Sequence, residues 1–219
     1  MAEPLRSEPA RGASLRLHWS PRSPFVRKVM IAAHELDLVD RIDKVRTVVA
    51  MRQPNVALLS DNALGKIPTL LLPDGTALFD SLTICEYLDD LAGGGRIIPR
   101  AGPARWRALT RHALGTGLLD LLILWRNERE KPAERQTPEW ISAFTLKTQT
   151  ALDRLEAEAA SLAETPFGVG EIAIGCVLSY LDFRYADLGW RNGRAGLAAW
   201  HESFAARPSA RATEIVANG

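Results

Sequence analysis

Strand-like and helix-like segments occupy different parts of this 219-residue chain. Every run with the two-residue period of a β-strand lies before residue 81, and from Pro103 onward only helical spacing is found. The stretch between them, GGGRIIPRAGP at 93–103, is rich in glycine and proline, as domain boundaries commonly are. This division predicts a small α/β domain followed by an all-helical bundle.

The first part alternates strand and helix signals. LRLHW at 15–19 predicts a strand, the segment 24–36 a helix, and KVRTVVA at 44–50 a second strand. The runs IPTLLL at 67–72 and TALFD at 76–80 flank the turn PDG and predict a hairpin, after which a helix starts at Ser81 and stops at Gly93. The predicted order is βαβ followed by ββα.

The second part predicts only helices, over 103–130, 138–163, 169–187, 194–206 and 209–217. We therefore divide the chain into a disordered tail (1–14), an α/β domain (15–92), a linker (93–102) and a helical domain (103–219).

Composition limits the partners. Lys and Arg number 27 against 26 Asp and Glu, with no block of like charge, so neither nucleic acid nor an anionic membrane is expected as a partner. The longest apolar run, LLDLLILW at 118–125, is too short for a membrane helix and contains Asp120. The first fourteen residues lack the apolar core of a secretory signal. We expect a cytoplasmic protein that binds small molecules or other proteins.

Cysteine and histidine do not indicate a metal site or a disulfide. Both cysteines, Cys85 and Cys176, lie in apolar helical patterns, which fits a reducing compartment. The four histidines are scattered without metal-ligand spacing, so we expect no metal: His18, His34, His112 and His201.

Ser23 stands where the first helix is expected to begin. A serine at the N-cap followed by a proline at the first helical position is an ordinary helix start, and Ser23–Pro24 fits that interpretation. The same place also favours an anion, including a thiolate, because free N–H groups and the helix dipole point there. Ser20, one turn earlier in the loop, is the weaker candidate for such chemistry.

Two further positions allow both a structural and a functional interpretation. Pro68 opens a buried strand, where proline is tolerated because the first residue need not donate to the ladder. Asp80 and Ser81 open the next helix, where an acid and a hydroxyl act as caps or bind a ligand. Each of the three features, namely the Ser23–Pro24 helix start, the proline at the start of a strand and the Asp80–Ser81 helix start, is common in proteins. Their occurrence in this order is much more specific.

In that order, the motifs resemble the cytosolic glutathione transferase family, in its serine-type bacterial branch related to the theta, delta and zeta classes. The resemblance rests on SPFVRKV, NALGKIPTLLLPDG, LFDSLTICEYLDD, FGVGEIAIGCVLSYLDFRY and LAAWHESFAARPS, and covers residues 15–210. It implies a thioredoxin-like N-terminal domain, an all-helical C-terminal domain, a cis peptide bond between Ile67 and Pro68, a homodimer, and glutathione as co-substrate.

The resemblance also implies roles for individual residues. Ser23 would donate a hydrogen bond to the glutathione sulfur, with Phe25 beside it in the same motif. Ile67 and Pro68 would hold the cysteinyl unit as an added strand. Asp80 and Ser81 would hold the γ-glutamyl end, and Lys66 the glycyl carboxylate. Because SPFV contains no cysteine, disulfide reductase chemistry is disfavoured.

One departure from the family pattern concerns a helix start in the second half. The family usually has a serine or threonine N-cap where this chain has Gly168, three residues before Glu171. Half of a capping box is therefore expected to be lost.

The expected activity is detoxification-type conjugation of the glutathione thiolate to a small, largely apolar electrophile. Trp106, Leu109 and His112 on one predicted helix face are candidates for the second-substrate pocket, although packing in the core or in a dimer interface explains such residues equally well. Two alternatives stay open. One is a zeta-like glutathione-dependent isomerase, whose SSC-type motif reads SPRSPF here; the other is a non-catalytic glutathione-binding or stress-associated protein.

Overall fold

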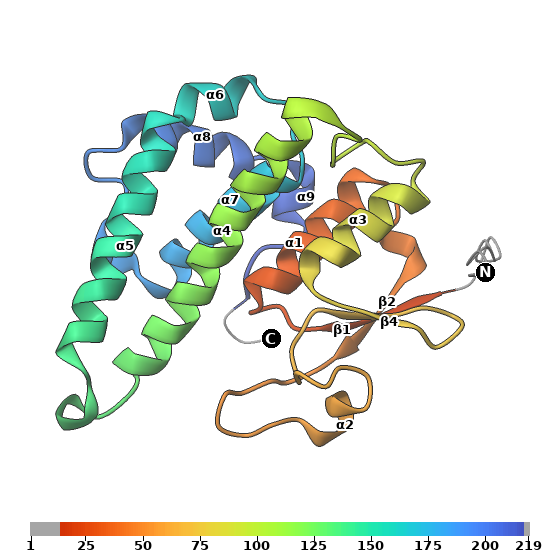
Figure 1. The fold of residues 1–219 in the computed structure, drawn as a ribbon, viewed down its shortest axis with the longest axis horizontal. Coiled ribbons are helices and arrows are strands. Elements are labelled where there is room, and N and C mark those ends of the chain that lie inside the picture. Colours follow the sequence, from red (N-terminus) through yellow and green to blue (C-terminus); the bar gives the residue numbers. More distant parts are fainter. Residues whose placement is uncertain (1–13, 217–219) are drawn as a thin grey trace.

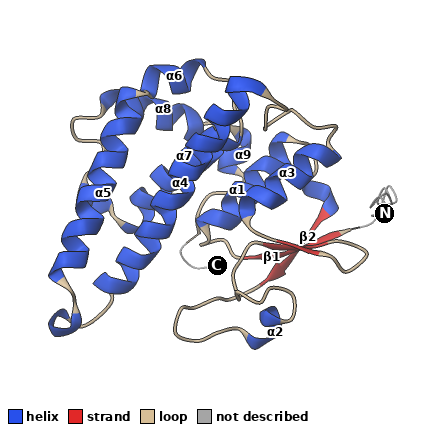
Figure 2. Cartoon of the chain, in the orientation of Figure 1, coloured by secondary structure: helices blue, strands red, loops and turns tan. Residues whose placement is uncertain are grey.

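The computed structural model describes residues 14–216, and in this part of the chain every strand lies before Phe79 and is followed by helices (Figures 1 and 2). The predicted tail lies outside the described residues except for Ser14, whose hydroxyl donates a hydrogen bond to Asp43. The predicted fold class, an α/β domain followed by a helical domain, is confirmed.

Four strands form one mixed sheet: β1 (Leu15–Trp19), β2 (Ile42–Arg46), β3 (Thr69–Leu71) and β4 (Ala77–Leu78). Their order is β2-β1-β3-β4; β1 and β2 are parallel, and β3 is antiparallel to both β1 and β4. The side chains of Leu15 and Leu17 are fully buried, as the alternation in β1 predicts. This is the sheet of a thioredoxin-like domain.

Helix α1 (Pro24–Glu35) connects the parallel pair and lies beside α3 (Ser81–Leu91) on one side of the sheet (Figure 1). The 3₁₀ turn η1 (Val39–Arg41) precedes β2, and the short helix α2 (Val56–Leu59) lies in the loop before β3. Nine residues of α1 are buried, because the helix packs against the helical half as well as on the sheet.

The helical half contains α4 (Gly102–Arg129), α5 (Pro138–Ala157), α6 (Ala159–Glu164), α7 (Val169–Arg184), α8 (Ala195–Ala205) and α9 (Pro208–Arg211), with 3₁₀ turns η2 (Ala133–Arg135) and η3 (Ala186–Leu188). Every residue from Val169 to Leu178 is buried, so α7 is the central helix of this half. It packs against both α4 and α1 and thereby joins the two halves in one core. None of the helices in residues 14–216 is long and apolar enough to span a bilayer.

The predicted strand at 44–50 is displaced toward the N-terminus. β2 runs over Ile42–Arg46, and the β-branched residues Val48 and Val49 are exposed outside the sheet. Its parallel partner β1 ends at Trp19, and after the bond from Thr47 N–H to the Trp19 carbonyl (2.8 Å) no further backbone of β1 is within reach. Strand propensity without a neighbouring strand does not extend the sheet.

The predicted helix at 138–163 is two helices. The chain turns at Glu158, whose carboxylate pairs with Arg154 (2.7 Å) and lies 3.6 Å from Arg111 of α4. After this turn, α6 directs Ala159 and Leu162 into the core. The last predicted helix, 209–217, is shorter than expected and appears as α9; residue 217 lies outside the described residues.

Candidate functional site

Strand register brings three of the predicted segments to one edge of the sheet. His18 near the end of β1 faces Thr69 at the start of β3, so Pro68 lies beside the loop that leads from β1 to α1. Leu70 faces Leu78 near the end of β4, so the chain that follows into α3 leaves at the same edge. The Ser20–Ser23 loop, the Ile67–Pro68 bond and the Asp80–Ser81 helix start therefore adjoin one another.

Ser23 is the N-cap of α1. Its Oγ accepts a hydrogen bond from the backbone N–H of Val26 (3.3 Å), and Pro24 occupies the first helical turn. Within the described chain the Ser23 hydroxyl donates to no other residue, so its hydrogen is available to a bound acceptor. Ser20 Oγ accepts from the N–H of Arg22 at 3.4 Å and stabilises the preceding turn. The Ser23 hydroxyl thus lies at the positive end of α1.

The bond between Ile67 and Pro68 is cis, as the sequence resemblance implies. The loop before it is held by Asn62, whose side chain is buried and donates to the carbonyl of Lys66 (3.1 Å) and the hydroxyl of Thr69 (2.9 Å). The backbone of Ile67 forms no hydrogen bond with another described residue. Its N–H and C=O are therefore available to an extended peptide, while Asn62 fixes their position.

Asp80 is the N-cap of α3, and its carboxylate accepts from the N–H groups of Leu82 (3.0 Å) and Thr83 (3.4 Å). Ser81 follows with a side chain only 1% exposed, and its Oγ has no hydrogen-bond partner among the described residues. Buried hydroxyls in native proteins are nearly always satisfied. An unsatisfied one at a helix start therefore suits a ligand that supplies an acceptor.

A buried lysine lies behind this edge. Lys28 of α1 is 0% exposed, and its ammonium contacts the hydroxyl of Thr116 (2.7 Å) and Nε2 of His112 (3.4 Å) on α4, while lying 5.1 Å from the ring centroid of Phe25. Burial lowers the pKa of Lys28. Burial, together with the Lys28 charge, lowers the pKa of His112 to about 3.

Charged side chains surround the same region from both halves of the chain. Lys66, in the loop before β3, and Asp120, on α4, are both exposed. Although the Asp120 side chain is exposed, nearby protein removes part of the hydration of its carboxyl and so raises its pKa; Lys66 and Lys28 oppose this increase, and Asp80 adds to it. Asp120 is therefore within electrostatic range of the residues predicted to hold glutathione.

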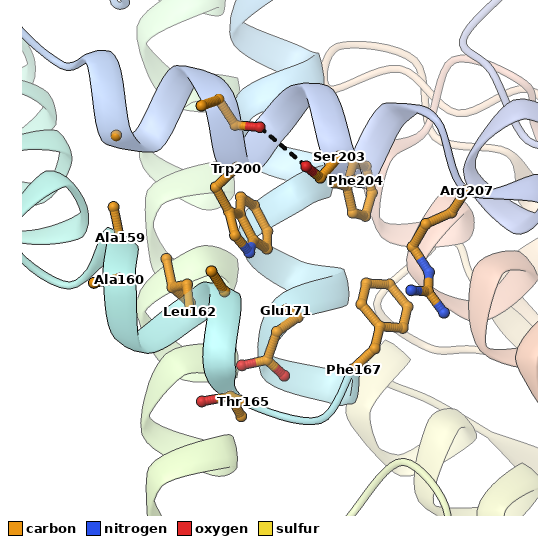
Figure 3. Close-up of a pocket in the computed structure, with 13 residues that line it drawn as sticks. Ala159, Ala160, Leu162, Thr165, Phe167, Glu171, Trp200, Ser203, Phe204 and Arg207 are labelled. Carbon is orange, nitrogen blue, oxygen red and sulfur yellow. Dashed lines mark hydrogen bonds between the residues drawn. The ribbon is translucent and has the colours of Figure 1, made fainter.

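The predicted second-substrate residues differ in their surroundings. Trp106 is 67% exposed, Leu109 is half-buried, and His112 is buried against Lys28. A cavity of about 570 Å³ lies instead between α6, α7 and α8, where Figure 3 shows Leu162, Trp200 and Phe167 around it. A smaller one of about 230 Å³ lies between α4 and α5. Neither is lined by Trp106, Leu109, His112 or the predicted glutathione residues.

The two cysteines do not take part in the site. Cys85 and Cys176 are unpaired and fully buried, and burial raises their pKa values to about 12 and about 11. Thiolates that react or bind metals need a lowered pKa. In residues 14–216 there is also no group of three or more His, Cys, Asp and Glu side chains that could hold a metal ion. Neither cysteine therefore supplies a reactive thiolate to this edge of the sheet.

Sequence reasoning missed three residues near this edge, namely Lys28, Asn62 and Asp120. The role of Asn62 depends on a carbonyl and a hydroxyl that only the folded loop brings within its reach. The only available signal for the other two was a charged residue inside an apolar helical pattern.

Comparisons with known proteins agree with this geometry. The family described as "Glutathione S-transferase, N-terminal domain" matches residues 22–91, and "Glutathione S-transferase, C-terminal domain" matches residues 138–203. Among curated proteins, the uncharacterized GST-like protein YibF of Escherichia coli (strain K12) is 29% identical over 202 residues, which cover 91% of this chain and 98% of that protein.

Solved structures give the same result. A glutathione transferase family member from Pseudomonas fluorescens Pf-5 with bound glutathione is 42% identical, with a TM-score of 0.89, and the match covers 93% of this chain and all of that one. A structure from the same organism with bound S-(propanoic acid)-glutathione is 40% identical, with a TM-score of 0.85 and the same coverage.

Proposed function

Because the chain belongs to the glutathione S-transferase family, we propose that it transfers the sulfur of glutathione to a small, largely apolar electrophile. We further place it in the serine-type branch of that family, with Ser23 as the residue that contacts the sulfur. The observation that carries the proposal is the Ser23 hydroxyl, which caps α1 and keeps its hydrogen free for an acceptor.

Glutathione would lie along the edge of the sheet, beside β3. The free backbone N–H and C=O of Ile67 would pair with its cysteinyl unit. The carboxylate of Asp80 would meet the γ-glutamyl ammonium, and the unsatisfied hydroxyl of Ser81 would meet the neighbouring carboxylate at the start of α3. Lys66 would reach the glycyl carboxylate. Phe25 would border the sulfur from the first turn of α1.

At the sulfur, two interactions would favour the thiolate. A thiol of pKa about 8.5 is only about 3% ionised at pH 7, and lowering its pKa by about 2 units would ionise roughly three quarters of it. That shift requires about 2.7 kcal/mol. A helix N-terminus supplies roughly 0.3–2 kcal/mol and a charge-assisted hydrogen bond roughly 1.5–3 kcal/mol. The start of α1 and the Ser23 hydroxyl together suffice.

The thiolate would then form a sulfur–carbon bond to the electrophile, and the displaced group or π electron pair would carry the negative charge away. A lower pKa also weakens the nucleophile, so the roughly 25-fold gain in thiolate is reduced to about threefold in rate. Most of the acceleration would therefore come from holding the electrophile beside the sulfur.

We also propose a homodimer in the cytoplasm. The cavity between α4 and α5 is lined by apolar residues apart from Lys147: Ala113, Leu114, Gly117, Leu118, Leu121 and Ala151. An apolar surface of this kind suits a contact with a second copy. The two unpaired cysteines suit a reducing compartment. Light scattering of the wild type and of Ala113→Glu, which places a charge on this exposed position, tests the dimer.

The test of the function compares Ser23→Ala with Ser20→Ala. Both variants lose one hydroxyl from the same loop, and calorimetry measures their glutathione affinity while conjugation is assayed with an aryl halide and an α,β-unsaturated carbonyl. Loss of the Ser23 hydrogen bond should lower the conjugation rate at pH 7 by about threefold through the lost thiolate, and further because the sulfur is no longer held toward the electrophile. Ser20→Ala should keep both rate and affinity. A wild-type protein that binds glutathione but conjugates neither electrophile would contradict the proposal.

A further inference from the structure

Asp120, in the middle of α4, carries a charge that no described residue pairs with. It interrupts the apolar run LLDLLILW at 118–125 and is exposed. Within the described chain it forms no hydrogen bond or ion pair, whereas Glu128 in the last turn of α4 and Glu130 at its C-cap are paired with Lys131 (2.6 Å) and Arg126 (3.3 Å). Asp120 therefore does not stabilise the helix through an ion pair, as these two glutamates do.

Helix geometry places Asp120 beside the glutathione site. Thr116 lies four residues earlier and so on the same face of α4, and its hydroxyl contacts the ammonium of Lys28 at 2.7 Å. Lys28 in turn lies against the ring of Phe25, in the first turn of α1. The face of α4 that carries Thr116 and Asp120 is thus turned toward the start of α1.

Three other charged residues interact electrostatically with the carboxyl of Asp120. Lys66, Lys28 and Asp80 are the charged groups that act on its carboxyl. Lys66 and Asp80 belong to the N-terminal domain and Asp120 to the helical half. The region between these residues is therefore bordered by both halves of the chain. An electrophile next to the sulfur of bound glutathione would lie in this region.

Binding of glutathione would leave Asp120 as the one solvent-exposed charge among these groups without a partner in the described chain. In the proposed complex, the charge of Asp80 is matched by the γ-glutamyl ammonium, and that of Lys66 by the glycyl carboxylate. Lys28 is 0% exposed, and its ammonium is already hydrogen-bonded to Thr116. The carboxylate of Asp120 remains exposed, and no residue in 14–216 pairs with it.

We propose that Asp120 selects the co-substrate by charge: it favours electrophiles that carry a cationic or strongly hydrogen-bond-donating group and disfavours those that carry a carboxylate. This inference rests on the proposed function, because it requires glutathione to occupy the neighbouring site. It concerns specificity alone, and Asp120 takes no part in the bond-forming step.

Binding of glutathione thioethers tests the inference without relying on turnover. The probes are S-(3-aminopropyl)glutathione and S-(propanoic acid)-glutathione, which place a positive and a negative group at a similar distance from the sulfur, and S-propylglutathione as the neutral reference. Calorimetry compares the wild type with Asp120→Asn. The control is Asp90→Asn, which removes one carboxylate from the exposed end of α3, where Asp90 forms no side-chain hydrogen bond or ion pair within residues 14–216.

In the wild type the amine should bind about tenfold more tightly than the carboxylate, since a unit charge near a protein surface contributes an interaction of this size. Asp120→Asn should reduce the ratio to within about twofold, and Asp90→Asn should leave it unchanged. If the wild type binds all three thioethers equally, or if Asp120→Asn keeps the preference, the inference is wrong although the proposed function stands. If neither glutathione nor any thioether binds, the proposed function fails as well.

Discussion

The ammonium of Lys28 on α1 lies 2.7 Å from the hydroxyl of Thr116 on α4, and no carboxylate of the described chain comes within ion-pair distance of it. The two halves are therefore joined here by a buried cation with neutral partners. Such a charge is costly to bury, and a well-packed apolar residue often stabilises a protein relative to it.

Lys28→Met should raise the free energy of unfolding near neutral pH by roughly 1–4 kcal/mol. The pKa of Lys28 in the folded state is below its usual value of 10.5, so the unfolded chain binds more protons between the two values. Wild-type stability therefore rises as the pH increases toward 10.5, and the advantage of the variant shrinks. Urea denaturation across this alkaline range measures it, with the exposed Lys44→Met as the control. A variant less stable than the wild type, with the same alkaline profile, would contradict this account.

Acid should destabilise the fold through His112. Its pKa is about 3 in the folded state against 6.5 for the free side chain, so the unfolded chain takes up the proton first as the pH falls through this range. Stability is then lost progressively between these values, by up to a few kcal/mol. His112→Gln should flatten this part of the curve in urea denaturation at several pH values. An equally steep curve in the variant would show that other groups cause the loss.

Two glycines of α4 provide a matched pair. A Cβ at Gly115 would lie 2.8 Å from the backbone carbon of Ala173 on α7, whereas a Cβ at Gly117 would meet nothing within 4 Å. Gly115→Ala should separate α4 from α7 and cost roughly 1–3 kcal/mol of stability. Gly117→Ala should be neutral or stabilising by up to about 1 kcal/mol, because alanine favours a helix. Equal effects in thermal unfolding would argue against a close approach at Gly115.

Asn62 should affect glutathione binding without touching the ligand. Asn62→Asp replaces the amide donor that faces the Lys66 carbonyl and the Thr69 hydroxyl with an oxygen that repels the carbonyl. Loss of the restraint on Ile67 should raise KM for glutathione about tenfold, with a smaller change in kcat. Steady-state kinetics measure both values, and Asn55→Asp, a change in the exposed loop before α2, is the control. A fall in kcat at constant KM would contradict a positioning role.

The sequence was sufficient to predict those parts of the structure that depend on residues close together in the chain. The Ser23–Pro24 helix start and the alternation in β1 follow from spacing alone, and both are confirmed. Tertiary contacts decide the rest. β2 ends early because β1 has no further backbone to offer, and the roles of Lys28 and Asn62 exist only once their partners are brought near.

Gly168 shows the same limit. Glycine stands here where the family usually has serine or threonine, so half of the capping box was expected to be lost. Glu171 keeps its half, accepting from the Gly168 N–H at 3.1 Å. The missing side chain has a cause in the fold, because a Cβ at this position would lie 2.5 Å from the carbonyl oxygen of Ile97. Contact with residue 97, far away in the sequence, is what excludes a serine here.

Bound glutathione should have its sulfur at the start of α1, beside the Ser23 hydroxyl. Ultraviolet absorbance of the thiolate, titrated in the glutathione complex, measures the pKa of that sulfur directly. The account predicts a pKa about 2 units below that of free glutathione in the wild type, and recovery of at least about 1 unit of this shift in Ser23→Ala. A bound thiol that titrates like free glutathione, or the same lowered pKa in Ser23→Ala, would contradict it.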